Sequence, residues 1–264
     1  MSAALPDARP TRPARSKLVW VAVALFLAMT AWSWDGIGFS PAELVEKADN
    51  ARRIVDDMFP VAWQAWPVLV EPLLETFRMA VIGSVIGCSL ALLVGFLASQ
   101  VTAPNGVVYG VSKTLMSVVR SIPDVLYALL FVAAVSIGPL AGVLALVFFN
   151  VGVVAKLLSE TVDAVPLGPL EAADAAGATF VQRVRAAVFP QVLPNYLAYA
   201  LYTFELNLRA SVVLGLVGAG GIGQVLRIAQ TRYRYDVIAL IIFVTFVIVF
   251  LVEALSISLR RRLS

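Results

Sequence analysis

Residues 171–190 read EAADAAGATFVQRVRAAVFP, an alanine-rich stretch with several charges that lies between two long apolar runs. Pro169 favours a helix start just before it, and Glu171 then falls in the first turn, where a carboxylate interacts favourably with the helix dipole. The alanines make a slim helix that fits deep into a groove. Gly177 permits a sharp turn or a close helix contact. The stretch predicts a helix that receives rigid-body motion from a soluble partner; an ordinary connecting helix is the alternative.

The rest of the chain is too apolar for a water-soluble protein. Of its 264 residues, 60% are hydrophobic and only 14% are charged, with a mean hydropathy of +0.89, whereas soluble domains have about 25% charged residues. We therefore expect an all-α membrane protein. The net charge of +3 is interpreted as orientation charge at the membrane. We expect no nucleic-acid partner, because that would need a basic patch on a soluble face.

The absence of histidine and the single cysteine exclude several chemistries. Disulfide frameworks, zinc clusters and histidine-based catalytic triads cannot form within this chain. The phosphate-binding pattern G-x-x-x-x-G-K-[ST] does not occur either. We expect a transport subunit rather than an enzyme, with no metal or other cofactor of its own. ATP and Mg²⁺ would then bind to a separate ATPase subunit.

Six apolar runs are long enough to cross a bilayer, which takes about 20 residues. We expect a tail at 1–17 and one transmembrane domain at 18–264, with a polar loop at 159–194 and spans at about 18–34, 77–99, 113–135, 139–158, 195–217 and 237–259. A cleaved signal peptide is the alternative for the first run. Trp32 and Trp34 favour a membrane interface there instead.

Six spans put both ends of the chain on one side of the cell membrane. Both ends are rich in arginine, so the positive-inside rule places them in the cytoplasm. The loop at 159–194 then also faces the cytoplasm. Arg227, Arg232 and Arg234 fall in an outward-facing loop and are an exception to the rule.

A charged segment at 40–58 lies between the first two spans. Ser40, Pro41 and Glu43 are typical of a helix start, and apolar residues follow at helical spacing. We expect an amphipathic helix on the periplasmic membrane surface. It is either a packing elbow without functional contacts or a lip that touches an external partner.

The spacing within residues 171–190 resembles the EAA loop of ABC-importer permeases. Asp174 lies within the matching stretch, whose matching positions are Glu171, Ala172, Ala173, Gly177 and Pro190. Ala187 and Phe189 stand where that family usually has isoleucine and leucine. The resemblance implies that this loop couples the chain to a cytoplasmic ATPase.

The resemblance extends from about residue 113 to the C-terminus. RSIP at 120–123, the EAA-like loop and GLVGAGGIG at 215–223 occur in the order of that superfamily. Similarity to the phosphonate and phosphite importer permeases rests on FELNLR at 204–209, LLSE at 157–160 and PQVLP at 190–194. It implies the type I importer permease fold with a cytoplasmic coupling helix. The implied partners are a second copy of the chain, two ABC ATPase subunits, an extracytoplasmic binding protein and membrane lipid.

Ionisable side chains within the spans need a reason, since each costs about 2.5–3.5 kcal/mol on insertion scales. Glu205 and Arg209 share one helix face and can neutralise each other. The same spacing recurs around Pro123, which is expected to bend its helix. Each pair is either structural or lines the path of a small anion. The candidate path residues are Glu205, Asn207, Arg209, Ser211, Arg120 and Asp124.

Two further features have mainly structural interpretations. Lys156 and Glu160 are interpreted as charges at the cytoplasmic end of the fourth span, and Cys88 as a packing residue near Gly83 and Gly87. GAGGIG at 218–223 matches a dinucleotide-binding pattern, but its apolar flanks exclude that fold. We expect a tight turn at the outer mouth, where backbone N–H groups can line an anion path, from Gly218, Gly220, Gly221 and Gly223.

Together these features predict the membrane subunit of an ATP-driven importer for phosphonate, phosphite or a related oxyanion, working by alternating access. Two alternatives stay open. One is a permease for another small solute such as an amino acid, and the other is a stand-alone secondary transporter or channel.

Overall fold

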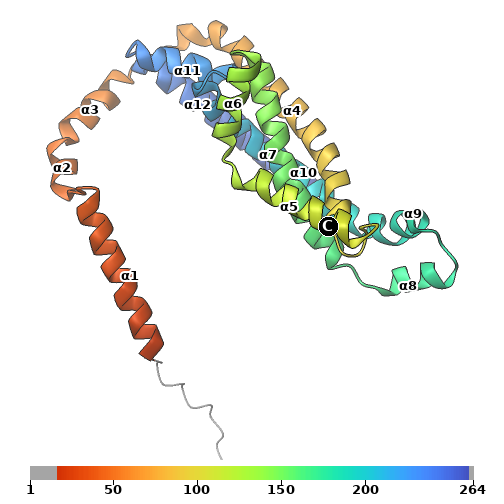
Figure 1. Ribbon diagram of the computed structural model, residues 1–264. Helices are drawn as coiled ribbons and strands as arrows, with labels where there is room; N and C mark the ends of the chain where they lie inside the picture. Colours follow the sequence, from red (N-terminus) through yellow and green to blue (C-terminus); the bar gives the residue numbers. More distant parts are fainter. Residues whose placement is uncertain (1–16, 262–264) are drawn as a thin grey trace, which may run out of the picture. The chain divides into compact units, whose positions relative to one another are not determined.

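The computed structural model describes residues 17–261, in which every regular element is a helix (Figure 1). The chain forms two compact units, residues 1–55 and 56–264. The predicted tail lies outside the described residues except for Lys17. The helices are α1 (Lys17–Gly36), α2 (Pro41–Glu46), α3 (Ala48–Asp57), η1 (Trp63–Ala65), α4 (Trp66–Leu97), α5 (Gly106–Ser121), α6 (Asp124–Val135), α7 (Pro139–Asp163), α8 (Gly168–Ala175), α9 (Phe180–Arg183), the π-helical turn η2 (Val184–Val188), α10 (Phe189–Leu216), α11 (Gly221–Thr231) and α12 (Tyr235–Arg260).

The first unit contains one long helix and a shorter, interrupted one. In α1, residues 19–36 are apolar enough to cross a membrane, and none of them is buried within the subunit. Pro41 lies in the first turn of α2 and Ser40 is at the N-cap position, as predicted, but the Ser40 side chain makes no capping hydrogen bond. The single helix expected at 40–58 is instead divided at Lys47. At this point the backbone hydrogen bonding is of the tighter 3₁₀ type, since the N–H of Asn50 bonds to the Lys47 carbonyl three residues earlier at 3.1 Å.

Length and composition suit four helices for membrane spans, namely α1, α4, α7 and α12. Two bent pairs also qualify when each pair is taken together. One is α5 with α6, at 88°, and the other is the helical stretch 180–216 with α11, at 41°. The described residues therefore contain four to six candidate spans, and the predicted fold class, an all-α membrane protein, is confirmed.

The third predicted span, 113–135, differs most from expectation. It is divided between α5 and α6, which meet at nearly a right angle. Pro123 has no N–H to donate and disfavours the helical region for the residue before it. Ile122 accordingly adopts extended backbone, with φ −93° and ψ 123°. The predicted bend at Pro123 is present, but it is a break rather than a kink.

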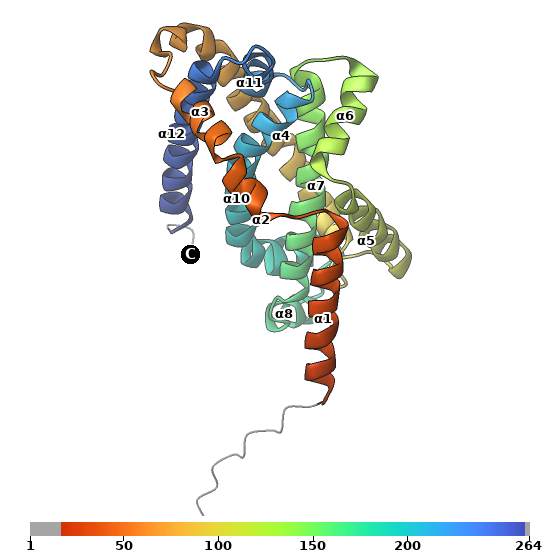
Figure 2. The same ribbon diagram turned by 90° about the vertical axis from the view of Figure 1, so that its left-hand side faces the viewer.

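The centre of the second unit is a close parallel pair, α4 and α7 (Figures 1 and 2). Glycines on α4 lie against larger side chains of α7, in the pairs Gly83–Leu146, Gly87–Asn150 and Gly95–Leu158. Both series advance by the same step, so the two helices run in the same direction. Small residues let helix backbones approach closely. A parallel pair also requires α5 and α6 to carry the chain back once between them.

α10 packs antiparallel to α4 and completes the core. The Asn207 side-chain amide donates to the Ser84 hydroxyl at 2.7 Å, and the Thr203 hydroxyl lies 3.5 Å from the sulfur of Cys88. Cys88 is buried there, as predicted. In Figure 2, α11 lies at one end of this unit and α8 at the other. The glycine-rich turn and the helix predicted near residue 171 are thus at opposite ends.

Candidate coupling surface and transport path

α8 is the helix predicted at the start of the EAADAAG stretch. Pro169 lies in its first turn together with Glu171. Its C-terminus is a Schellman motif, in which the N–H of Gly177 bonds to the Asp174 carbonyl and the N–H of Ala178 to the Ala173 carbonyl, both at 3.0 Å. Gly177 has φ +73°, a conformation that glycine adopts without strain. The chain therefore turns sharply at Gly177, as the sequence predicts.

One face of α8 is anchored and the other is free. Leu170 is buried among side chains of α7, the π-helical turn and α10, and Ala173 packs beside it. The exposed positions are Glu171, Ala172, Asp174, Ala175, Ala176 and Gly177. A partner that grips this small-residue surface can therefore move α7 and α10 through Leu170.

The loop after α8 is held by contacts that the sequence analysis missed. Arg183 of α9 binds Asp174 of α8 at 3.1 Å, and Thr179 starts α9 with a capping box formed with Gln182. An exposed pair of this kind contributes at most about 1 kcal/mol. Its main effect is to fix the angle between α8 and α9. The T-x-x-Q spacing was the signal in the sequence.

Pro190 lies in the first turn of α10, directly after the π-helical turn Val184–Val188. In a regular α-helix a proline ring clashes with the carbonyl four residues earlier, and a wider π turn relieves that crowding. Ala187 of this turn is buried in the cluster that anchors α8. The proline therefore marks the joint between the loop and the long helix.

A network of four charges links α10 to α12. The buried carboxylate of Glu205 binds Arg209 one turn further along and lies 3.6 Å from Arg260 of α12. Arg209 also binds Glu253 of α12 at 3.2 Å. The predicted pair of Glu205 and Arg209 is present, but its two partners on α12 were missed. Glu253 is the one ionisable residue within the apolar run 237–259, which was a signal in its own right.

Arg209 and Asn207 face different surroundings. The Arg209 side chain is 47% exposed and borders a groove of 470 Å³ between α10, α11 and α12, which Glu253 also lines. Asn207 is fully buried, donates to Ser84 of α4 and accepts nothing at its side-chain oxygen within the described residues. Ser211, also buried, donates to the Asn207 carbonyl. Asn207 therefore joins α10 to α4, whereas the Ser211 bond lies within α10.

Arg120 and Asp124 do not meet. The Asp124 carboxylate accepts the N–H of Val125 at 2.9 Å at the start of α6. Arg120 lies in the last turn of α5, and its side chain packs on Gly152 of α7. No ion pair joins Arg120 to Asp124 within residues 17–261, because the break at Pro123 removes the helical geometry that would bring side chains four residues apart together.

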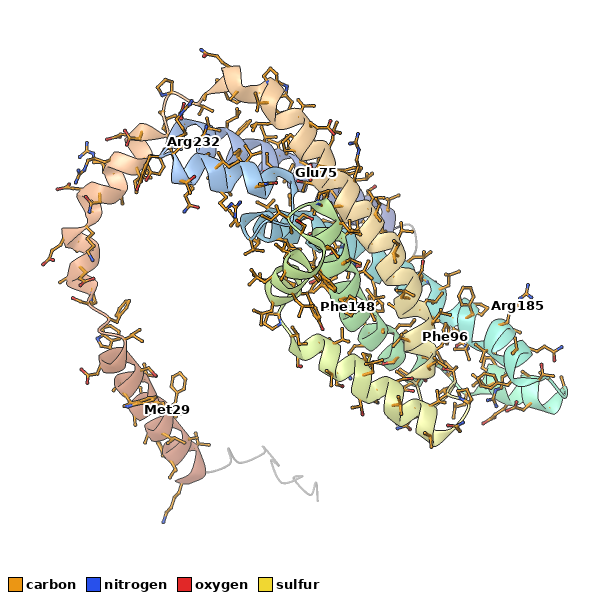
Figure 3. The ribbon with its side chains drawn as sticks, turned by 45° about the horizontal axis from the view of Figure 1, so that its top comes forward. Met29, Glu75, Phe96, Phe148, Arg185 and Arg232 are labelled. Carbon is orange, nitrogen blue, oxygen red and sulfur yellow. The ribbon has the colours of Figure 1, made fainter. Side chains whose placement is uncertain are left out.

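The glycine-rich turn at 218–223 is held in place by hydrogen bonds to side chains of α4. Gly218, Gly220 and Gly221 have φ of +98°, +85° and +67°, and the backbone of Gly223 packs against that of α10. The first N–H groups of α11 are used within the chain, since the Glu75 carboxylate accepts from Gly221 at 3.0 Å and the Thr76 hydroxyl accepts from Ile222 at 2.8 Å. Figure 3 shows Glu75 at this end of α4.

We predicted that backbone N–H groups of this turn line an anion path. Two of these groups, those of Gly221 and Ile222, already donate to side chains of α4. A Cβ at Gly220 would lie 2.5 Å from the Glu75 carboxylate, so the turn and α4 fit only because the residue is glycine. The chain's own carboxylate already occupies the N-terminus of α11, where an anion is favoured.

A helical bundle with a tight parallel core, broken spans, charges inside the membrane region and a free small-residue helix at one end defines a membrane-spanning transport subunit. The chain belongs to the family of binding-protein-dependent transport system inner membrane components, whose sequence model matches residues 91–264. It is therefore the permease of an ABC importer and not an enzyme. ATP hydrolysis belongs to a separate subunit.

Individual relatives agree with this assignment. The chain is 36% identical over 241 residues to the phosphite transport system permease protein PtxC of Stutzerimonas stutzeri, covering 91% of this chain and 87% of that protein. It is 36% identical to the phosphate-import permease protein PhnE of Mycolicibacterium smegmatis, over 88% of this chain and 43% of that protein.

The fold has a match among solved structures. A chain of the MetNI methionine ABC transporter in an inward-facing conformation superposes with a TM-score of 0.67 at 24% identity, covering 77% of this chain and all of that one. At this identity the likeness concerns the fold alone. It supports the type I importer permease architecture.

Proposed function

We propose that this chain carries a tetrahedral phosphorus oxyanion, phosphite, phosphonate or phosphate, across the cell membrane into the cytoplasm. The observation that carries the substrate class is the similarity to PtxC over nearly the whole chain. An arginine-containing charge network within the spans is compatible with anionic cargo. The amino-acid alternative has weaker support, because the methionine transporter shares the fold at lower identity.

The working unit would be two copies of this chain with two ABC ATPase subunits and an extracytoplasmic binding protein. Both termini and the loop containing α8 would face the cytoplasm, with α11 on the outer side. One of the outward arginines is neutralised within the chain, since Arg234 binds Asp236 through two bonds of 2.9 Å. The positive-inside rule counts lysine and arginine rather than net charge, so these arginines remain an exception to it.

α8 would be the coupling helix. Closure of the ATPase subunits would push its exposed face, from Glu171 to Gly177. Leu170 and the joint at Pro190 would pass that displacement to α7 and α10. The two copies would then rock, opening the path outward, and ATP hydrolysis would return them to the inward-facing state.

The transport path would include Arg209 and Arg120, each of which is exposed on the single subunit. Glu205 and Glu253 would hold Arg209 until the anion arrives. Asn207 would contribute by fixing α10 on α4, Ser211 by its bond to the Asn207 carbonyl within α10, and Asp124 by accepting the N–H of Val125 in the first turn of α6. No covalent bond would form or break in this chain.

The test is ATPase stimulation of the reconstituted complex by its binding protein. We expect the binding protein to stimulate hydrolysis when it is loaded with phosphite, phosphonate or phosphate, and to do nothing when it is offered methionine. Stimulation by methionine alone would end the oxyanion proposal and support the amino-acid permease.

A further inference from the structure

A charged pocket lies beside the break between α5 and α6, apart from the Arg209 network. Its volume is 440 Å³, and its walls come from α5, α7 and α10: Arg120, Val153, Lys156, Leu157, Glu160 and Tyr202. Three of these six residues carry a formal charge, and the sum is +1. The groove beside Arg209 is lined by other residues, so the two are separate cavities.

Arg120 reaches this pocket at the middle depth of the bundle. Its stem lies against Gly152, where a Cβ would come within 2.9 Å of the arginine Cγ. Gly152 is within one turn of the centre of α7, a helix of 25 residues that is about 37 Å long. A helix of this length crosses the hydrocarbon core, about 30 Å thick. The Arg120 stem therefore lies near the middle of α7, and the pocket extends from there along α7 to Glu160.

An arginine at this depth needs a polar environment, because acyl chains cannot solvate it. Arg120 and Tyr202 are both exposed on the single subunit. Within the described chain, neither the Arg120 guanidinium nor the Tyr202 hydroxyl has a hydrogen bond or an ion pair. Lys156 is held by Glu160 at 2.6 Å. The pocket thus offers several free donors, and Arg120 lacks a counter-charge.

The backbone at the pocket has the form that transporters use at their binding sites. Interrupted helices near the midplane expose polar groups at a depth where continuous helices do not. Here α5 ends at Ser121, one residue beyond Arg120, and α6 restarts at Asp124 after an 88° change of direction. The break between the two helices therefore lies next to Arg120, whose positive charge has no ion pair in the described chain.

We propose that this pocket is an oxyanion site on the transport path, an inference that rests on the function proposed above. The Arg120 guanidinium binds two oxygens of a tetrahedral anion in its fork, the geometry in which arginine recognises phosphate groups. The Tyr202 hydroxyl donates to the same anion. Lys156 leaves Glu160 to join it, and Glu160, whose side chain is 56% exposed, turns to water. Return of Lys156 to Glu160 releases the anion.

The test measures the charge preference of the pocket in the purified complex of this chain with its ATPase subunits, in detergent. Cys88→Ser removes the native thiol, and Val153→Cys places one in the pocket wall. We expect an anionic methanethiosulfonate reagent to modify this thiol about tenfold faster than a cationic one, because the uncompensated charge attracts anions. Inorganic phosphate should slow the anionic reagent, and chloride at equal ionic strength should not.

Variants assign the effect to Arg120. Arg120→Gln should abolish both the charge preference and the protection by phosphate, whereas Arg120→Lys should retain part of each. Arg78→Gln is the matched control, since Arg78 pairs with Glu71 on α4 away from the pocket, and it should behave as wild type. A thiol at Val85→Cys, exposed on α4, should react independently of phosphate.

The proposal would be overturned by equal rates for the two reagents, by an absence of protection by phosphate, or by an unchanged response in Arg120→Gln. A thiol that reacts with neither reagent would also contradict it, because the pocket would then be closed, for instance by a carboxylate of a second copy. The assay contains no binding protein and no transport step. Its failure is therefore distinguishable from failure of the ATPase stimulation test.

Discussion

Glu205 is a buried carboxylate inside the membrane-spanning bundle, and its charge is balanced by Arg209 and Arg260. Breaking a fully buried ion pair costs about 3–5 kcal/mol. The loss of Arg209 should cost less, since it is half exposed and Arg260 remains near Glu205. The residue is therefore open to substitution without loss of the fold.

We predict that Arg209→Ala abolishes phosphite uptake into proteoliposomes while the complex still assembles, as judged by size-exclusion chromatography. Failure of assembly would instead indicate a structural ion pair.

The double variant Glu205→Gln with Arg209→Gln separates the two roles. It removes both charges of the buried pair and leaves Glu253 and Arg260 of α12 as the two opposite charges of the network, and we expect normal assembly without uptake. Recovery of uptake in this double variant would mean that Arg209 serves only to neutralise Glu205.

Gly177 acts through its backbone. A side chain at φ +73° costs about 1–2 kcal/mol, enough to disturb the Schellman motif at the end of α8. We predict that Gly177→Ala retains membrane insertion but lowers the stimulation of ATPase by loaded binding protein, and that Gly177→Asp removes it. Gly168→Ala is the control, because Gly168 has ordinary φ and open space around its Cα. Equal loss of coupling in both alanine variants would contradict this role for Gly177.

At the scale of single residues, the sequence predicted pairs that are close along one helix and missed pairs that only tertiary packing brings together. Glu205 with Arg209 follows from helical spacing alone. Glu253 and Arg260 reach the same site from α12, and no spacing along the chain encodes that meeting. Arg120 and Asp124 are the opposite case. Their four-residue spacing predicted a pair, but the helix breaks between them at Pro123 and the pair does not form.

Among the elements, the pair of α4 and α7 fixes the frame on which the charged residues lie. Their close approach depends on glycine, because a Cβ at Gly87 would lie 2.6 Å from the Cβ of Asn150. The G-x-x-x-G spacing predicted close packing, but the identity of the neighbouring helix came only from the structure.

We predict that Gly87→Val lowers the thermal midpoint of the detergent-solubilised complex, since overpacking a tight contact costs about 1–3 kcal/mol. Gly110→Ala on α5 is the control, because no atom lies within 4 Å of a Cβ at that position. An unchanged midpoint in Gly87→Val would show that the helices can separate without penalty, contrary to the described packing.

The sequence predicted the ends of a helix correctly where an apolar run, a proline or a glycine determines them. Apolar length predicted α1, α7 and α12 closely, and Pro169 with Gly177 predicted both ends of α8. The right angle between α5 and α6 was out of reach, because Pro123 encodes an interruption but the direction of the next helix depends on packing against α7. The cap on α11 was missed for a similar reason, since Glu75 and Gly221 meet only in the folded chain.

For the whole molecule, the proposed coupling surface and the glycine-rich turn lie at opposite ends of the second unit (Figure 2). α8 and the joint at Pro190 lie at one end of the second unit and the pinned glycine turn at the other. The two charged cavities lie between them. This arrangement suits a subunit that transmits a push from one side and opens toward the other, while chemistry remains with its partner.

A separate ATPase is proposed to drive this chain through α8. Site-directed cross-linking from position 172 tests it most directly, using Ala172→Cys in a Cys88→Ser background within the native membrane. We expect a cross-link to the ATPase subunit, formed only with reagent that reaches the cytoplasmic face, and altered in yield by ATP. A cross-link to the extracytoplasmic binding protein, or labelling of this thiol from outside the cell, would contradict it.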